Sequence, residues 1–154
     1  MQVMKRILID TDVILDFFFD RRPFSEFAAR IFSLCESNEI QGFVTPVIYS
    51  NVYHLLRQTS SHEKVIEKMV QLLTITDVLL MDRTVVQCAL TSGFKDFEDA
   101  LQNFSAINNG TIEVIITRNI KDYKHSDIGV LTPENFLKMH SVNHPTFKAP
   151  PGSK

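Results

Sequence analysis

The chain has 154 residues and a formal net charge of −2 at pH 7, with 44% hydrophobic and 22% charged residues. This length fits one domain with one sizeable core. The charge excludes a histone-like basic protein, although it leaves room for a local basic patch. Two cysteines without CxxC spacing exclude a disulfide framework and a thiolate zinc site. We expect both thiols, Cys35 and Cys88, to be buried in the core.

No run approaches the ~18 apolar residues of a membrane span, and the apolar region near the N-terminus is too short for a signal peptide. We therefore expect a cytoplasmic protein with no membrane partner. Residues 141–154 carry three of the six prolines and show no periodicity, which predicts an extended or disordered tail. The predicted domain accordingly covers residues 1–140.

Short apolar runs alternate with amphipathic stretches in the first half of the chain. Residues 6–10 form an Ile- and Leu-rich run that ends in an acid, which predicts a buried strand followed by a short helix. Apolar residues at helical spacing predict a helix over 24–37. Residues 42–45 predict a second strand, and Thr45 and Pro46 have the residue types of a helix N-cap and first position.

The alternation continues through the second half. The Ser pair at 60–61, Asp82 and Asp96 are residue types that cap helices, and Asn109 with Gly110 is a typical helix stop. Strands that alternate with helices predict one α/β domain, with a parallel sheet covered by helices on both faces. The predicted elements are helices over 62–74, 83–91 and 97–109, strands over 78–81, 113–117 and 129–131, and a last helix opened by Thr132 and Pro133.

Acidic residues stand where predicted strands end and predicted helices begin. Ligands of an open parallel sheet bind outside the carboxyl ends of its strands. If the strands over 6–10 and 113–117 are neighbours, these acids converge at one edge of the sheet. An acid that directly follows an apolar strand at this edge, as Asp10 does, is the strongest functional candidate. The residues that share this placement are Asp10, Asp96, Asp99 and Asp122, with Thr117 and Asn119 close by.

Carboxylates that meet at one point repel one another and favour a bound cation. A set of hard oxygen ligands without Cys or His suits Mg²⁺ or Mn²⁺ better than zinc. Such an ion polarises a phosphoryl oxygen and activates water, so the pattern indicates phosphodiester hydrolysis.

Each acid also has a structural alternative. Asp96 and Asp12 fit helix N-caps, and Asp99 fits a first-turn acid that the helix dipole favours. Asp16 and Asp20 fit solvated surface positions, as most acids do.

Four blocks of sequence stand in a characteristic order: residues 7–16 (ILIDTDVILD), 94–101 (FKDFEDAL), 115–123 (IITRNIKDY) and 130–137 (VLTPENFL). Together they resemble the PIN domain, the nuclease fold of the bacterial VapC-type toxins, over roughly residues 5–137. The resemblance implies a three-layer α/β/α fold with a central, mainly parallel sheet of about five strands. It also implies a divalent-metal-dependent endoribonuclease that hydrolyses RNA, is often a homodimer and is often inhibited by a cognate antitoxin protein.

The resemblance assigns the family's first catalytic Asp to Asp10 and its third acid to Asp99, with Asp96 as a neighbour. Asp12 stands where the family usually has Asn or Ser. We therefore predict a catalytic set in which Asp10, Asp99 and Asp122 hold Mg²⁺ or Mn²⁺. Asp96 completes this set, with Asp12 and Thr117 in support.

Two positions depart from the family pattern. Asn51 stands where the family often has Glu, in the helix after the second strand, and Asn119 stands where it often has its last Asp, with Asp122 one turn on. An amide oxygen can ligate a metal but brings no charge, so we assign both Asn residues a supporting role. The departures predict weaker metal binding, with one tight ion.

Arg118 and Lys121 lie beside the predicted site, and phosphate contacts from them would hold RNA despite the net charge of −2. The alternative is that they are ordinary solvated cations. The five histidines show no ligand spacing and are assigned no chemistry. The three adjacent aromatics at 17–19 cannot all face inward from one helix, so we expect at least one to be exposed and available to a partner. Further candidates for the cationic rim are Arg21, Arg22 and Arg57.

Three other functions compete with the nuclease. Residues 10–13 (DTDV) fit the nucleophile motif of a HAD-type phosphatase, but only 35 residues follow Asn119, and no later strand ends in paired acids. A receiver-type regulatory domain needs a different order of acids. The third alternative has the same PIN-like fold, with Asn51 and Asn119 having removed enough charge to leave a catalytically weak or inactive module that binds RNA or protein.

Overall fold

The computed structural model describes residues 4–143, so most of the predicted tail lies outside the described residues, while residues 141–143 belong to the last helix. Five strands form one sheet in which every neighbouring pair is parallel, in the order β3-β2-β1-β4-β5. The predicted α/β fold around a parallel sheet is confirmed. The strands are β1 (Lys5–Ile9), β2 (Ile40–Val44), β3 (Thr76–Val78), β4 (Val114–Ile116) and β5 (Gly129–Leu131).

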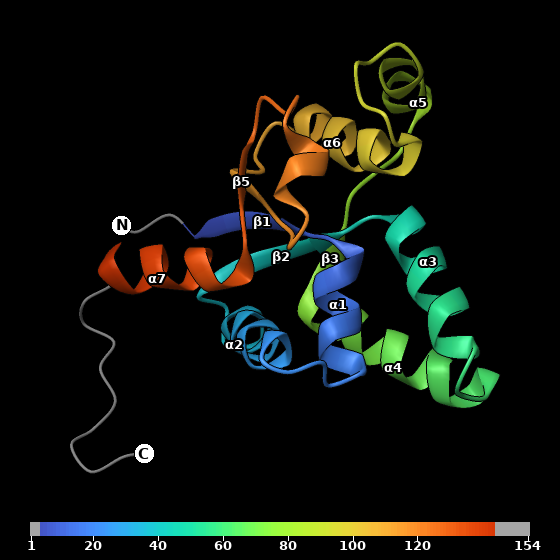
Figure 1. Ribbon diagram of the computed structural model, residues 1–154, viewed down its shortest axis with the longest axis vertical. Coiled ribbons are helices and arrows are strands. Elements are labelled where there is room, and N and C mark those ends of the chain that lie inside the picture. The colour runs from blue at the N-terminus through green and yellow to red at the C-terminus, as the bar shows by residue number, and fades with distance from the viewer. Residues whose placement is uncertain (1–3, 144–154) are drawn as a thin grey trace.

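Helices cover both faces of this sheet and complete three layers. Figure 1 shows α5 and α6 on one side and α1, α2 and α4 on the other, with α7 beside α2. The helices are α1 (Thr11–Phe18), α2 (Phe24–Glu36), α3 (Pro46–Arg57), α4 (His62–Ile75), α5 (Arg83–Leu90), α6 (Phe97–Asn109) and α7 (Pro133–Asn143), with a 3₁₀ turn, η1, over Ile120–Tyr123.

Strand β1 is central because its sequence is apolar on both faces. Ile7, Leu8 and Ile9 are all fully buried, as expected of a strand between two helical layers. Leu8 lies opposite Ile115 of β4, so the strands that carry the predicted site are neighbours. The Asp10 N–H then donates to the Ile116 carbonyl at 3.0 Å and extends the ladder by one bond. The predicted meeting of the two strand ends is confirmed.

Local capping rules explain most helix boundaries. Thr45 accepts a hydrogen bond from the Ile48 N–H and is followed by Pro46 at the first helical position. Asp82 and Asp96 cap α5 and α6 in the same way. Gly110 ends α6 with φ of 81°, a left-handed conformation that glycine adopts without steric cost.

Two predicted boundaries are wrong. The third strand is Thr76–Val78 rather than 78–81, because pairing with Gly42–Val44 of β2 determines where an edge strand begins. The apolar run misled us because Leu79 is buried, while Leu80 is 81% exposed. Helix α1 is capped by Asp10 and not by Asp12, so Asp12 lies inside its first turn.

The buried side chains fall into two clusters. The large one surrounds β1 and includes both sheet faces, and a smaller one joins α5 to α6. Cys35 is buried as expected, whereas Cys88 is only partly buried, so that expectation is wrong for one thiol. No helix within residues 4–143 combines the length and the apolar character that a membrane crossing requires. The small cluster consists of Val85, Ala89, Ala100 and Leu101.

Candidate active site

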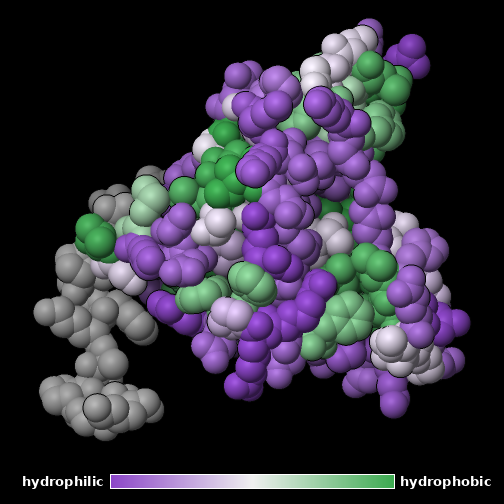
Figure 2. Space-filling view, in the orientation of Figure 1, coloured by the Kyte–Doolittle hydropathy of each residue, from purple (hydrophilic) through white to green (hydrophobic). Residues whose placement is uncertain are grey.

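A pocket of about 580 Å³ opens at the carboxyl ends of β1 and β4. In Figure 1 helices α1 and α3 begin at this end of the sheet. Figure 2, in the same orientation, shows mostly hydrophilic residues across the middle of the molecular surface. Most of the predicted site residues share this pocket, which also takes in residues that we did not predict. The lining includes the predicted Asp10, Asp12, Arg21, Asn51, Asp96, Asp99, Arg118, Asn119 and Asp122, together with His54, Glu98 and Gln102.

Asp10 is both a helix cap and a pocket residue. Its Oδ1 accepts from the Thr11 N–H at 2.8 Å, and its Oδ2 accepts from the Thr117 hydroxyl at 3.0 Å and the Tyr123 hydroxyl at 3.2 Å. Burial, with a smaller contribution from the neighbouring Asp12, raises the pKa of Asp10 to about 6. These contacts hold the carboxylate in one orientation.

Tyr123 is a site residue that the sequence analysis missed. Burial beside the carboxylates of Asp10 and Asp99 raises the pKa of the Tyr123 hydroxyl, so it remains protonated and can donate to Asp10. No periodicity marks this role, since Tyr123 ends the short turn η1 and its burial depends on packing against the sheet.

Asp12 carries one oxygen that the fold leaves unused. Its Oδ2 accepts from the Arg118 backbone N–H at 3.0 Å and lies 3.3 Å from the Thr117 hydroxyl. A hydroxyl has one proton, and the shorter Thr117 distance is the one to Asp10. The other oxygen, Oδ1, is buried, and no residue within 4–143 donates a hydrogen bond to it. Burial also raises the pKa of Asp12.

Asp96 and Asp99 enter the pocket from the start of α6. Asp96 caps the helix by accepting from the Asp99 N–H at 3.0 Å, so its structural alternative is correct, and it lines the pocket as well. Burial raises the pKa of Asp99 to about 7, and the nearby carboxylates of Asp10, Asp96 and Asp122 add to the increase. Four acids therefore interact electrostatically in one pocket.

The chemistry of these donors fits a hard divalent cation, because carboxylate and amide oxygens predominate and no thiol lines the pocket. The unpartnered Oδ1 of Asp12 and the repulsion that Asp99 experiences from Asp10, Asp96 and Asp122, in addition to its burial, are what a cation would relieve. Over residues 4–143, however, no three His, Cys, Asp or Glu side chains are grouped closely enough to bind one ion. The acids share the pocket without converging on one point.

Asn51 and Glu98 face each other across the pocket. The Asn51 amide donates to the Glu98 carboxylate at 3.0 Å, which joins α3 to the start of α6. The sequence analysis assigned no role to Glu98, which lies between the predicted site residues Asp96 and Asp99. Glu98 on α6 therefore places a carboxylate next to Asn51, the position at which the family often has Glu.

Asp16 is not solvated, and that prediction is wrong. Its side chain is 1% exposed, and its carboxylate binds the guanidinium groups of Arg118 and Arg21. Its spacing of four residues from Asp12 puts both side chains on one face of α1, but this spacing alone does not indicate burial. Asp20, by contrast, is exposed beside Arg22.

The predicted cationic rim is only partly present. Arg118 and Arg21 line the pocket, whereas Lys121, Arg22 and Arg57 are not among its lining residues. Phe17 and Phe19 are exposed, which confirms that at least one of the three adjacent aromatics reaches the surface.

A five-stranded parallel sheet with an acidic pocket at the carboxyl ends of the neighbouring strands β1 and β4 defines a three-layer α/β domain with a candidate metal-binding site. A family model described as PIN domain matches residues 6–121. The chain belongs to the PIN domain family, as its sequence blocks predicted, and the phosphatase and receiver-domain alternatives have no support.

Known relatives agree with this assignment. The chain is 25% identical over 139 residues to Ribonuclease VapC1 of Aquifex aeolicus (strain VF5), covering 87% of this chain and 94% of the relative. Two solved structures share the fold. VapBC2 from Rickettsia felis, bound to a DNA fragment from its promoter, matches with a TM-score of 0.62 at 12% identity, over 82% of this chain and 96% of the other. A toxin-antitoxin complex from Klebsiella pneumoniae matches with a TM-score of 0.62 at 21% identity, over 82% and 97%.

Proposed function

We propose that this protein is an endoribonuclease that hydrolyses RNA phosphodiester bonds with a bound Mg²⁺ or Mn²⁺, and that it is the toxin of a toxin-antitoxin pair. The observation that carries the proposal is the shared pocket of Asp10, Asp96, Asp99 and Asp122, in which burial and then repulsion from the other carboxylates raise the pKa of Asp99 to about 7. Membership of the PIN domain family and the similarity to a VapC ribonuclease support it.

Each acid has a distinct role in the proposed site. Asp10, Asp99 and Asp122 would hold the ion, in part through its bound waters, because their carboxylates do not converge on one point. When bound, the ion would polarise a phosphoryl oxygen and lower the pKa of a bound water. Thr117 and Tyr123 donate to the same oxygen of Asp10 and keep its carboxylate facing the pocket.

The remaining residues support these three acids. Asp96 caps α6 and thereby fixes the backbone that carries Asp99. Asp12 adds negative charge, while Asn51 and Asn119 are neutral oxygen donors at the pocket wall. Arg118 and Lys121 contact RNA phosphates in this proposal.

The proposed partners follow from the relatives. Ribonuclease VapC1 is named as a ribonuclease, and the solved structures with the same fold include toxin-antitoxin complexes. We propose that this chain is likewise bound by an antitoxin protein, which inhibits it. We also propose, from the resemblance to the PIN domain family, that it acts in the cytoplasm and forms a homodimer.

The test is RNA cleavage by the purified protein in Mn²⁺, Mg²⁺ or EDTA, with structured and single-stranded RNA as substrates. We expect cleavage that needs a metal ion and disappears in Asp10→Asn, because the substitution removes the carboxylate that the rest of the site orients. Asp127→Asn is the matched control, since Asp127 is exposed and lies outside the pocket lining. Equal cleavage by wild type and Asp10→Asn would contradict the proposal.

A non-cleaving module that binds RNA or protein is the second candidate. Two observations favour it: the neutral Asn51 and Asn119 in the pocket, and the lack of a compact three-ligand cluster over residues 4–143. Metal binding measured by calorimetry, without cleavage of any RNA, would identify this module.

A further inference from the structure

We propose that Arg21 and Arg118 form a phosphate-binding site for the RNA backbone at the rim of the acidic pocket, and that the buried Asp16 positions both guanidinium groups. This inference rests on the proposed ribonuclease function, in which Arg118 already contacts an RNA phosphate, and adds Arg21 as a second phosphate contact and Asp16 as the residue that positions both.

The geometry begins at Asp16. The Oδ2 of Asp16 accepts from Arg118 Nε at 2.6 Å, and its Oδ1 accepts from Arg118 Nη2 at 3.0 Å. This two-pronged contact is the strongest geometry that an Arg and a carboxylate can form. Arg21 Nε lies 3.0 Å from the same Oδ1. One buried carboxylate therefore holds two cations.

The charge balance distinguishes this arrangement from an ordinary buried ion pair. The two guanidinium groups and the one carboxylate in direct contact have a net charge of about +1, and Asp12 also interacts electrostatically with Arg118. Both cations line the acidic pocket. The side chain of Arg118 is still 30% exposed and that of Arg21 44% exposed. The surplus positive charge is thus open to solvent beside a group of carboxylates.

Both guanidinium groups are held in place before any ligand binds. Arg118 lies over the Phe24 ring at 4.1 Å, and Arg21 lies over the Phe19 ring at 5.6 Å. Such prior ordering lowers the entropic cost of binding. An arginine has five N–H donors, and within residues 4–143 Asp16 is the only hydrogen-bond or ion-pair partner of either side chain. Several donors therefore remain for a ligand.

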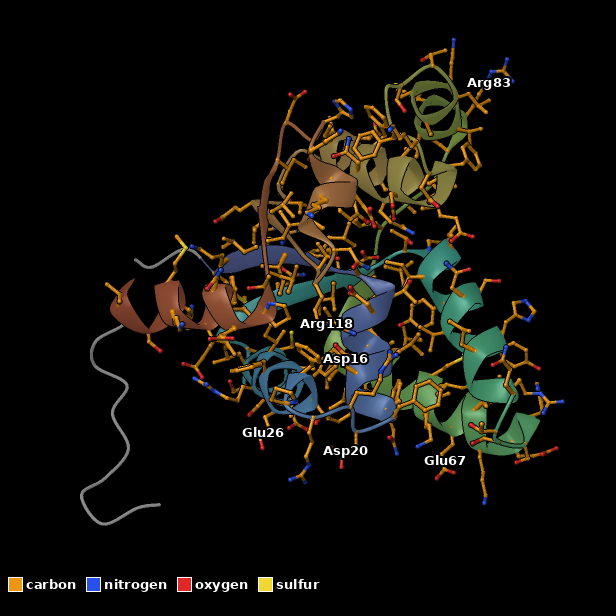
Figure 3. All side chains as sticks on the ribbon, viewed as in Figure 1. Asp16, Asp20, Glu26, Glu67, Arg83 and Arg118 are labelled. Carbon is orange, nitrogen blue, oxygen red and sulfur yellow. The ribbon has the colours of Figure 1, made fainter. Side chains whose placement is uncertain are left out.

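The position of Arg118 relates this site to the catalytic acids. Its backbone N–H donates to Asp12 Oδ2 at 3.0 Å, and Thr117, which precedes it, donates to Asp10. An anion bound to the Arg118 guanidinium thus lies next to the acids. Figure 3 shows Asp16 and Arg118 close together beside α1, with Asp20 at the far end of that helix.

A phosphodiester is the ligand that fits these features. Planar guanidinium groups match the oxygens of a phosphate, and the chain needs a local cationic contact because its net charge is −2. A substrate cleaved at the acids would place a phosphate of a flanking nucleotide at this rim. Such contacts fix the register of the strand without reading its bases.

The first test compares Arg21→Gln and Arg118→Gln with Arg22→Gln. The probe is a fluorescent single-stranded RNA of mixed sequence, and its affinity is measured in EDTA over a range of salt concentrations. Each removed phosphate contact should reduce the slope of log K against log salt by about 0.7. Arg22 is the matched control because it pairs with the exposed Asp20 and does not line the pocket. Its substitution should leave the slope unchanged.

The second test measures whether removal of one negative charge tightens or weakens RNA binding. Asp16→Asn and Asp20→Asn each remove one negative charge, so electrostatics alone predicts tighter RNA binding by both. If Asp16 positions the arginines, Asp16→Asn instead weakens binding about threefold to tenfold, the size expected for loss of a charge-assisted contact. A thermal melt shows whether this variant is folded. Arg21→Gln changes a half-exposed side chain and therefore tests the same site even if Asp16→Asn is unfolded.

In the cleavage assay Arg21→Gln should raise KM and leave kcat within about twofold, as loss of uniform substrate binding requires. The proposal is overturned if Arg21→Gln has the same salt slope as Arg22→Gln, or if folded Asp16→Asn binds RNA as tightly as wild type. Metal-dependent cleavage by wild type with either result would overturn this inference alone. A wild-type protein that neither binds nor cleaves RNA would overturn the proposed function as well.

Discussion

Asp10 illustrates how one side chain serves the fold and the site together. Its backbone closes the β1–β4 ladder, one oxygen caps α1, and the other accepts two hydroxyl groups while the carboxylate lines the pocket. The orientation of this carboxylate is therefore set by the sheet and by the start of α1. A metal ion or substrate is not needed to establish it.

Asp99 has a pKa near 7 in the folded protein and an ordinary pKa of about 3.9 when unfolded. Between these values the folded state binds a proton that the unfolded state does not, so stability falls as pH rises through this window. We expect Asp99→Asn to melt at a higher temperature than wild type at pH 8 in EDTA, with the difference vanishing near pH 4. Circular dichroism melts at both pH values measure this.

Added Mn²⁺ provides the control for the Asp99 prediction. It should raise the melting temperature of wild type at pH 8 and have a smaller effect on the variant, because ligand binding stabilises the folded state by mass action. A variant that is less stable than wild type at pH 8 would indicate a structural role for Asp99.

Residues next to predicted strand ends could be selected from sequence, and Asp10, Asp99 and Asp122 were. Asp16 and Tyr123 could not, because their burial depends on how α1, η1 and the end of β4 pack together. A solvated acid and an acid that binds two arginines have the same local sequence signature.

Strand β2 contains a glycine that the packing of its neighbours requires. A Cβ added to Gly42 would lie 2.8 Å from Cys35 Sγ and 3.0 Å from Ile9 Cδ1. We expect Gly42→Ala to lower the free energy of unfolding by about 1–3 kcal/mol, the usual cost of overpacking a core. Urea denaturation measures this loss.

The double variant isolates the cause of that loss. Cys35→Ala removes the closer of the two contacts, so the double variant should be more stable than the sum of the single changes allows. Strict additivity would mean that the loss comes from the strand backbone and not from contact with α2.

Helix boundaries were more predictable than the edge strand β3, whereas the other edge strand, β5, has the bounds that the sequence predicted. Capping residues such as Thr45, Asp96 and Gly110 act within one turn, so sequence alone locates them. Strand β3 has only three residues, and its position depends on pairing with β2, which lies more than thirty residues earlier in the chain. Local sequence patterns do not determine which residues of β2 and β3 pair with each other.

From sequence, the pairing of β1 with β4 could only be assumed, because no local sequence pattern indicates which strands are neighbours in the sheet. Its confirmation brings together acids that are about ninety residues apart in the chain. The two sides of the resulting site belong to different packing units. Asp10 follows the central strand of the large cluster, whereas Asp96 and Asp99 begin α6, where the small α5–α6 cluster lies.

We expect these two units to differ in amide hydrogen exchange. Few apolar side chains hold α5, and Leu90 and Val86 on it are exposed, so local opening there should cost less free energy than opening β1. Exchange measured by mass spectrometry should be faster in α5 and the first turn of α6 than in β1 and β4. Equal protection of all four segments would contradict this.

The small α5–α6 cluster therefore has a thermodynamic consequence for the site. An ion held by both Asp10 and Asp99 can bind only while the start of α6 is docked, so its apparent dissociation constant is its intrinsic one divided by the docked fraction. Packing around Val85 and Ala89, which line no part of the acidic pocket, would then contribute to the affinity for the proposed ion. Ion binding at the proposed site would depend on the stability of the α5–α6 helical hairpin as well as on the acids themselves.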